Sequence, residues 1–226
     1  MHTNRVLKKI NPNDKPKRVI KIVKEVIKNI IKDNKFPIVI GGEHSISYGF
    51  YLGLKEKFDN LAVIQFDAHA DLRQIYNNSK YNHACVMARI RETAEAIQIG
   101  IRSLSEEEAF EIKMKNYKIF WAKDFYCKNL NSDIIKEVKR FRNLFITIDI
   151  DVFDPSLVHT GTPEPGGLNW YQLTQLLREI CETNKVVGFD VVETISNNLS
   201  SNSDFLVARL IYKLIGYIFR NTLMHY

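Results

Sequence analysis

Histidines and aspartates gather in three short stretches of this chain. Residues 67–71 read Asp-Ala-His-Ala-Asp, residues 149–151 read Asp-Ile-Asp, and His44 follows a pair of glycines. Carboxylates brought to one place repel one another and are costly to desolvate, so a cation is expected among them. Oxygen ligands with some imidazole nitrogen suit Mn²⁺, whereas sulfur-seeking metals would require cysteine. Two divalent ions would balance four aspartates and could lower the pKa of a shared water toward neutrality.

The spacing of these residues predicts how they converge. In an extended segment, side chains at i, i+2 and i+4 point to one face. We therefore expect Asp67, His69 and Asp71 to share a face, and Asp149 and Asp151 to do the same on another strand. Each stretch alone has a structural interpretation as a turn, loop or cap. Their joint occurrence favours a binuclear metal site. Its predicted ligands are His44, Asp67, His69, Asp71, Asp149 and Asp151.

Short apolar segments alternate with longer amphipathic ones along the chain. The short segments predict strands at 37–40, 61–66, 96–101, 118–121, 144–148 and 186–189. The amphipathic segments predict helices at 17–33, 45–58, 105–115, 132–141, 170–183 and 204–218. This alternation predicts a mostly parallel sheet with helices on both faces.

Four of the predicted strands run directly into acidic or histidine residues. The first is followed by Gly41-Gly42-Glu43-His44, the second by Asp67, the fifth by Asp149 and the sixth by Asp190. Ligands of parallel α/β sheets bind beyond the carboxyl ends of the strands. The sequence therefore predicts one site at one edge of the sheet.

The length of 226 residues suits one α/β domain spanning residues 1–226. Residues 1–35 carry eleven Lys or Arg and three acids, a net +8 within an overall +6. A nucleic-acid patch is one interpretation of this segment, and the solvated face of an amphipathic helix is the other. Apolar residues recur between the lysines at helical spacing, which favours the helix and no nucleic-acid partner.

No apolar run approaches the roughly 20 residues of a membrane span, and residues 1–13 lack a secretory apolar core. A cytoplasmic protein without a membrane partner is expected. The three cysteines, Cys85, Cys127 and Cys181, have neither metal-type nor disulfide-type spacing, so they are interpreted as incidental thiols.

Five motifs together resemble the ureohydrolase family of arginases, agmatinases and their relatives, over roughly residues 37–218. They are the segments 41–45 (GGEHS), 66–73 (FDAHADLR), 147–156 (TIDIDVFDPS), 160–168 (TGTPEPGGL) and 188–193 (GFDVVE). The resemblance implies a three-layer α-β-α sandwich of the arginase type, N-terminally shortened, with about six to eight strands in its sheet. It also implies two Mn²⁺ per subunit on the six predicted ligands, and a homo-oligomer, trimeric or hexameric.

The resemblance further assigns the chemistry. Glu193 matches the carboxylate that docks a substrate guanidinium, His83 matches a proton-transferring histidine, and Asp151 is expected to relay a proton as well as to bind metal. A metal-bridging hydroxide would attack the guanidinium carbon. Glu43 stands where many relatives have aspartate.

Residues 72–81 lack the arginase-like Ser-Gly-Asn-x-His-Gly pattern and look like those of agmatinases, so cleavage of agmatine to putrescine and urea is expected. Alternatives are guanidinobutyrate, arginine or a formimino compound, for which Arg73 or Arg89 could bind a carboxylate. A catalytically silent metal-binding relative is a further alternative.

Overall fold

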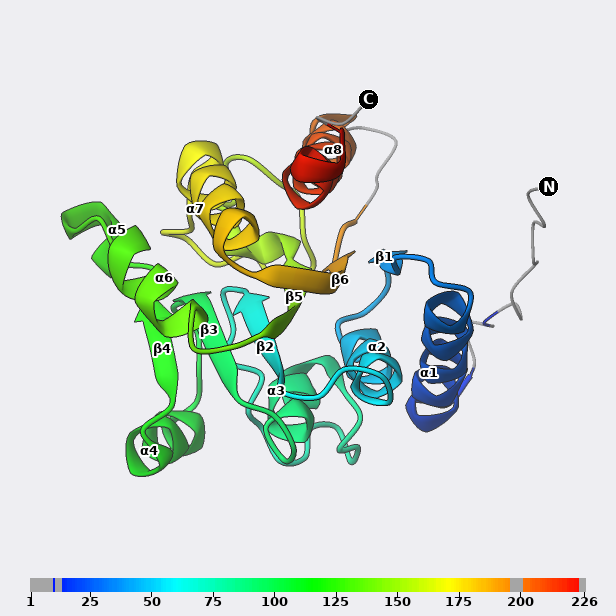
Figure 1. The fold of residues 1–226 in the computed structure, drawn as a ribbon. Coiled ribbons are helices and arrows are strands. Elements are labelled where there is room, and N and C mark those ends of the chain that lie inside the picture. The colour runs from blue at the N-terminus through cyan, green and yellow to red at the C-terminus, as the bar shows by residue number, and fades with distance from the viewer. Residues whose placement is uncertain (1–9, 11–13, 196–200, 224–226) are drawn as a thin grey trace.

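Six strands form one sheet in the order β1-β6-β5-β2-β3-β4, and every neighbouring pair is parallel (Figure 1). The computed structural model describes residues 10, 14–195 and 201–223. The strands are β1 (Ile38–Ile40), β2 (Leu61–Phe66), β3 (Ala96–Ile101), β4 (Lys118–Trp121), β5 (Asn143–Asp149) and β6 (Lys185–Val192). The predicted strands at 61–66, 96–101 and 118–121 match in full, and the other three differ by one to three residues at an end.

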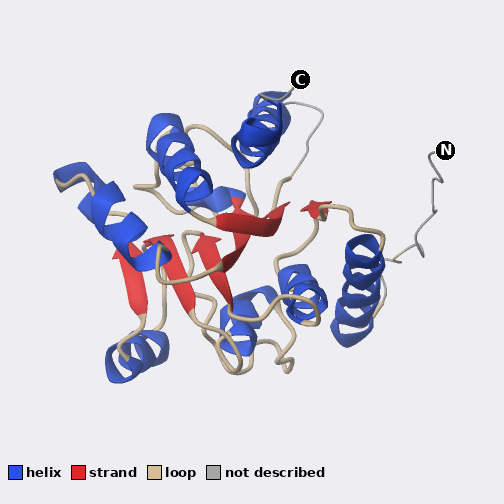
Figure 2. Cartoon of the chain, viewed as in Figure 1, coloured by secondary structure: helices blue, strands red, loops and turns tan. Residues whose placement is uncertain are grey.

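Helices cover both faces of the sheet, which gives the three layers seen in Figure 2. One face carries α1 (Pro16–Lys32), α2 (Ile46–Lys55), α3 (Val86–Ile90) and α4 (Glu106–Lys115). The other face carries α5 (Asp124–Cys127), α6 (Asn131–Val138), α7 (Trp170–Thr183) and α8 (Ser201–Leu223). The fold class predicted from the sequence is confirmed. The sequence did not predict α3, α5 or the 3₁₀ turns η1 (His83–Cys85) and η2 (Ile150–Val152), which are too short to show a periodic pattern.

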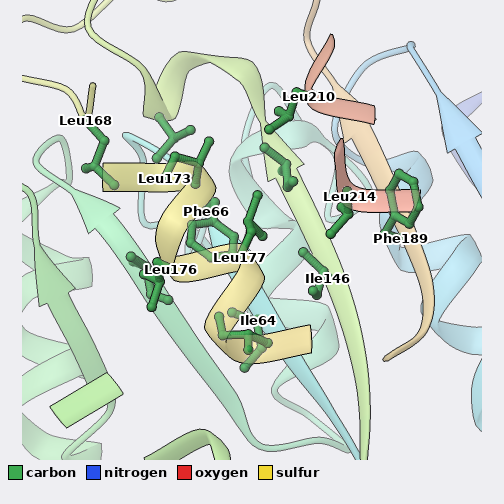
Figure 3. Packing of buried hydrophobic residues seen from close by; sticks show 14 of the residues in the cluster. Ile64, Phe66, Ile146, Leu168, Leu173, Leu176, Leu177, Phe189, Leu210 and Leu214 are labelled. Carbon is green, nitrogen blue, oxygen red and sulfur yellow. The ribbon is translucent and has the colours of Figure 1, made fainter. Parts of the chain in front are cut away.

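Side chains of the central strands alternate between two hydrophobic clusters. In β2, Ile64 and Phe66 pack toward α7 and α8, whereas Val63 packs toward α1 and α2. Figure 3 shows Ile64 and Phe66 beneath Leu176 and Leu177 of α7. Both faces of the sheet are thus buried, which explains why these strands read as nearly continuous apolar runs. Polar residues within them are therefore exceptional.

The basic N-terminal helix has the predicted amphipathic character. In α1, Ile20, Val23, Ile27 and Ile31 are buried, while Lys24 and Lys28 form ion pairs with Glu56 at the end of α2. Its lysines thus lie on the solvated face of a packed helix. Among the helices of the described residues, none combines the length and the apolar character that crossing a membrane requires.

The four strands with acidic or histidine residues at their ends are neighbours in the sheet. They are β1, β6, β5 and β2, in that order. Because all strands are parallel, their carboxyl ends lie at one edge. Gly41 and Gly42, with φ of 80° and 89°, turn the chain from β1 into the segment that carries His44.

Candidate metal centre

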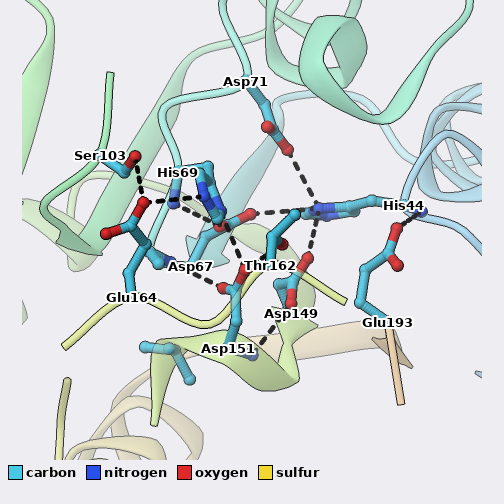
Figure 4. A network of polar contacts seen from close by, with 12 residues as sticks. His44, Asp67, His69, Asp71, Ser103, Asp149, Asp151, Thr162, Glu164 and Glu193 are labelled. Carbon is cyan, nitrogen blue, oxygen red and sulfur yellow. Dashed lines mark hydrogen bonds and ion pairs between the residues drawn. The ribbon is translucent and has the colours of Figure 1, made fainter. Parts of the chain in front are cut away.

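Three carboxylates surround the ring of His44 at this edge. Its Nδ1 atom lies 3.1 Å from Oδ2 of Asp67, 3.1 Å from Oδ2 of Asp71 and 3.3 Å from Oδ2 of Asp149 (Figure 4). This nitrogen is buried and has no hydrogen bond of normal geometry among the described residues. The other ring nitrogen, Nε2, lies 3.0 Å from the hydroxyl of Thr147. The ring nitrogen of His44 and the carboxylates of Asp67 and Asp71 are close enough together to hold a cation, and Asp149 lies beside the same nitrogen.

A second group lies beside the first. Nδ1 of His69 is 2.9 Å from Oδ2 of Asp151 and 3.6 Å from Oδ1 of Asp67. The two oxygens of Asp67 therefore face different histidines, so this carboxylate belongs to both groups. All six residues predicted as ligands are brought together.

The backbone brings them together differently from the expected extended segments. Strand β2 ends at Phe66, and Asp71 has a φ of +54°. Asp149 ends β5, but Asp151 lies in η2. The prediction that alternation along a strand aligns these side chains was wrong. Aspartate accepts hydrogen bonds from backbone two residues on and tolerates positive φ, so these segments turn.

The same aspartates hold those turns. Oδ1 of Asp67 accepts a hydrogen bond from the backbone N–H of His69 at 2.6 Å. Oδ1 of Asp149 accepts one from the N–H of Asp151 at 3.0 Å. A carboxylate can thus fix its own loop and still present its second oxygen to the cluster.

The electrostatics of the cluster favour a bound cation. Burial, together with the charge of Asp67, raises the pKa of Asp71 to about 7. Burial also raises the pKa of Asp149 well above its usual range. Ionising these carboxylates side by side costs free energy that divalent cations would offset. With oxygen and imidazole donors and no thiol, the residues have the donor set of a divalent-cation site.

A cavity of about 280 Å³ opens over the cluster. The cavity is lined by three of the predicted ligands and by two residues outside the ligand set. The ligands are His69, Asp71 and Asp149, and the other two residues are His83 and Glu193. The loop 160–168 contributes Gly161 and Thr162 to its wall. Two of the predicted catalytic residues therefore face the same space as three of the predicted ligands, whereas Asp151 does not line the cavity.

Glu193 follows β6 in the left-handed backbone region, with a φ of +60°. Its N–H donates to the carbonyl oxygen of Gly42 at 3.0 Å, and its Oε1 accepts from the backbone N–H of His44 at 2.7 Å. Burial raises the pKa of Glu193. These contacts tie the carboxylate to the loop that carries His44.

His83 is held by Glu43. Oε1 of Glu43 accepts from the backbone N–H of His83 at 2.5 Å and lies 3.1 Å from Nδ1 of its ring. The hydrogen bond with Glu43 raises the pKa of His83, and burial only partly opposes it. The ring edge also meets Tyr76, with centroids 5.7 Å apart. The sequence identified Glu43 only as a departure from the family pattern, and the structure gives it this contact.

Two supporting residues near Asp151 were missed by the sequence analysis. Arg102 donates from Nη2 to the carbonyl oxygens of Asp151 at 2.7 Å and of Glu164 at 2.8 Å. Thr162 donates to Oδ2 of Asp151 at 3.3 Å. Arg102 follows β3 directly. A search of the strand ends for cations, as well as for acids and histidines, would have found this residue.

The fold and the site define a class: a parallel α/β protein with a histidine and carboxylate cluster at the carboxyl ends of adjacent strands. The model of the arginase family matches residues 5–216, and the chain belongs to this family. The resemblance found in the sequence is confirmed.

Individual proteins similar to this chain support the family assignment. The chain is 39% identical over 191 residues to an N(1)-aminopropylagmatine ureohydrolase of Synechocystis sp., a match covering 83% of this chain and 62% of that protein. It is 36% identical to an agmatinase of Pyrococcus horikoshii, covering 87% of this chain and 69% of that one. The crystal structure of the agmatine ureohydrolase of Thermoplasma volcanium superposes with a TM-score of 0.85 at 32% identity, covering 96% of this chain and 74% of that chain. This chain thus spans roughly two thirds of the length of such relatives.

Proposed function

We propose that this protein is a ureohydrolase that holds two Mn²⁺ and hydrolyses the guanidinium group of agmatine to urea, releasing putrescine. The observation that carries the proposal is the Asp67 carboxylate shared between two imidazole-centred groups, with Glu193 in the same cavity. Membership of the arginase family and the names of the relatives support it.

Each metal would take its own imidazole. His44, Asp71 and Asp149 would serve one ion, and His69 and Asp151 the other, with Asp67 available to both. When bound, such a metal pair acts as a Lewis acid and makes a water nucleophilic at neutral pH. The protein fixes this geometry by placing the ligands at the carboxyl ends of β1, β2 and β5, which lie at one edge of the sheet.

Glu193 would bind the guanidinium. Its carboxylate lines the cavity and is held by the backbone N–H of His44, so it can accept a charge-assisted hydrogen bond without moving. The short link from Glu193 to His44 also sets the distance between the bound guanidinium and the first group of ligands. Orientation of this kind lowers the barrier by restricting the substrate beforehand.

His83 and Asp151 would handle protons. Hydrolysis adds water across the bond between the guanidinium carbon and the alkyl-bearing nitrogen, and the departing amine takes up a proton. His83 lies at the cavity with its ring half-exposed, where it can give that proton to the amine or exchange it with bulk water. Asp151, whose Oδ2 lies near both His69 and Thr162, is the second group that could hold it.

The cavity wall bears on which substrate enters. Arg89 is buried and donates to Gln74 at 2.6 Å, and its Nη1 lies 3.2 Å from Glu92, so it has no place in carboxylate binding. Arg73 does line the cavity, with its guanidinium 5.1 Å from the ring centroid of Tyr76 and its Nε 3.9 Å from Glu108. The positive charge of Arg73 is therefore matched by the negative charge of Glu108 in the same wall. A wall matched in this way suits a substrate without a carboxylate.

A second candidate substrate is N(1)-aminopropylagmatine, for which the Synechocystis relative is named. It shares the guanidinium of agmatine and differs in a longer cationic tail. We further propose one catalytic domain spanning residues 1–226 that assembles as a homotrimer or homohexamer in the cytoplasm. Light scattering on the purified chain would test the assembly.

The test of the proposal is urea release by the Mn²⁺-loaded protein from agmatine, N(1)-aminopropylagmatine, arginine and guanidinobutyrate in parallel. Release from either of the first two, slowed roughly tenfold to 150-fold in Glu193→Gln, is the expected result. Urea from arginine or guanidinobutyrate alone would refute the substrate class. No urea from any of them, in protein holding two Mn²⁺, would refute the proposed reaction and leave a hydrolase of a formimino compound or a silent metal-binding relative.

A further inference from the structure

A chain of polar side chains runs through the sheet behind Asp67. Gln65 of β2 and Gln98 of β3 are paired neighbours in the sheet, and both are fully buried within otherwise apolar strands. Nε2 of Gln98 donates to Oε1 of Gln65 at 2.5 Å, and Nε2 of Gln65 donates to Oδ2 of Asp67 at 2.6 Å. A buried amide is costly unless it is fully hydrogen-bonded, so this pair calls for an explanation.

The chain begins at a cation. Arg91, which follows α3, donates from Nε at 3.2 Å and from Nη2 at 3.0 Å to Oε1 of Gln98. Its guanidinium carbon lies 3.9 Å from the ring centroid of Tyr117, and Nη2 also donates to the carbonyl oxygen of Ala96 at 3.0 Å. Burial lowers the pKa of Arg91 to about 10, which leaves it charged at neutral pH.

The charge of Arg91 fixes the direction of every hydrogen bond that follows. A guanidinium only donates, so the oxygen of Gln98 must face it. The amide nitrogen of Gln98 then points the other way, to the oxygen of Gln65 and to the carbonyl oxygen of Ala70 at 2.7 Å. The amide nitrogen of Gln65 is left to face Asp67 at 2.6 Å and, more distantly, Asp71 at 3.5 Å. With the opposite orientation, an amide oxygen would oppose the carboxylate.

Asp67 thereby receives one N–H on each oxygen. Oδ2 accepts from Gln65 and faces His44, while Oδ1 accepts from the backbone of His69 and faces its ring. The backbone bond alone would leave the carboxylate free to rotate. The second bond fixes its plane, so that each oxygen keeps a lone pair directed to its own group of ligands.

We propose that Arg91, acting through Gln98 and Gln65, is a positioning residue that orients Asp67 for binding both metal ions. The proposal rests on the metal site of the proposed function. Partners behind the ligands of a metal site tune metal affinity by roughly ten- to hundredfold. Arg91 itself touches neither the cavity nor any predicted ligand in the described contacts, so it acts only through the two glutamines.

The direction of the amides separates this relay from simple packing. Gln98→Glu keeps an acceptor for Arg91 and forms an ion pair with it, but it offers Gln65 only an acceptor. The Gln65 amide must then turn, and its oxygen faces Asp67. Gln65→Met removes the donor while nearly keeping the volume. Arg91→Lys preserves a donor-only cation and should rescue what Arg91→Met loses.

The experiment measures Mn²⁺ binding to the full chain in the absence of substrate. Binding is read from the electron paramagnetic resonance signal of free Mn²⁺. The control is Asn143→Leu, which removes a different buried polar contact, the hydrogen bond to the carbonyl oxygen of Asp59, at the far end of β5. At about 3.3 Å per residue that end lies roughly 20 Å from Asp149.

Gln65→Met, Gln98→Glu and Arg91→Met should bind Mn²⁺ roughly ten- to hundredfold more weakly than Asn143→Leu, and Arg91→Lys should bind nearly as the unmodified chain does. Binding by Gln65→Met and Gln98→Glu within twofold of the control would overturn the relay and leave the proposed function standing. Failure of the unmodified chain to bind Mn²⁺ would overturn both.

Discussion

Oδ2 of Asp67 lies 3.1 Å from Nδ1 of His44, although Asp67 follows β2 and His44 follows β1, with β6 and β5 between those strands. The loops after the two strands thus reach across the edge of the sheet to meet. Without a cation between these side chains, the buried imidazole of His44 could pair with only one of the three carboxylates around it. A cation bound among them would offset the cost of burying so many acids together.

Asp67→Asn should abolish binding of both metals, because the side chain is shared by the two groups. The amide keeps the size of the side chain but loses the negative charge and one acceptor. Metal content by mass spectrometry should fall from two Mn²⁺ per chain toward none, and urea release should fall with it. The matched control is Asp133→Asn, an exposed aspartate in the first turn of α6. Retention of two Mn²⁺ by Asp67→Asn would contradict the assignment.

His83→Asn should lower kcat by roughly 10²–10⁴-fold, the usual contribution of a general acid or base, and leave the metal content at two per chain. The reason is that His83 lines the cavity without belonging to either ligand group around His44 and His69. Steady-state kinetics and metal analysis on the same preparation would test this. Unchanged turnover would remove His83 from the mechanism.

Glu43→Gln should shift the dependence of kcat/KM on pH to lower pH. The Glu43 carboxylate raises the pKa of His83, with smaller contributions from Asp71 and Glu193. The protonated form of His83 is therefore favoured in the folded protein, and the stability that it contributes is lost as pH rises through this raised pKa. Neutralising Glu43 removes that preference, so the limb of the kcat/KM profile that belongs to His83 should shift downward.

The control for this prediction is the double variant Glu43→Gln, His83→Asn, in which that limb should be absent. A limb that stays in place in Glu43→Gln would mean that another group titrates there. Glu43→Asp should keep the charge, and its profile should stay closer to that of the unmodified chain.

The sequence was enough to predict the fold class, and to predict that the six histidine and aspartate side chains proposed as ligands lie together. Continuous apolar runs and helical periodicity reflect burial, and burial is what the sheet and its helices provide, so strands such as 61–66 and 96–101 were predicted in full. The residues proposed as ligands were selected because parallel strands place their ends at one edge. This rule does not depend on local backbone detail, and it held even though the extended-segment prediction for residues 67–71 was wrong.

What the sequence could not give were contacts between residues distant in the chain. The pairing of Gln65 with Gln98 depends on the register of β2 against β3, and the contact of Glu43 with His83 depends on two loops meeting. The only sign of the Gln65–Gln98 pairing in the sequence is a glutamine within an apolar strand. Arg102 was missed because cations at strand ends were not counted as part of a metal site.

Glu193→Gln should lower kcat/KM for agmatine by roughly tenfold to 150-fold, because a hydrogen bond to a charged group contributes about 1.5–3 kcal/mol. The backbone N–H of His44 can still donate to the amide oxygen at this position, so the fold and the metal content should persist. Kinetics with metal analysis would test the prediction. Loss of metal together with activity would instead indicate that Glu193 chiefly holds the loop of His44.

Gly167→Ala should destabilise the protein and loosen the segment that carries Asp151. A Cβ at this position would lie 2.3 Å from the carbonyl carbon of Phe153 and 2.4 Å from the backbone nitrogen of Asp154. The loop would have to move away from Phe153, where Leu168 and Phe153 now form a parallel bridge. Overpacking of this kind costs about 1–3 kcal/mol, which should lower Tm by several degrees.

The comparison variant is Gly216→Ala, in α8, where an added Cβ meets nothing within 4 Å. Alanine is a better helix former than glycine by about 1 kcal/mol, so this change should raise Tm slightly. Thermal unfolding of both variants by circular dichroism would test the pair. An equal Tm in the two variants would contradict the close packing of loop 160–168 against Phe153, and with it the role of that loop in holding Asp151 at the metal centre.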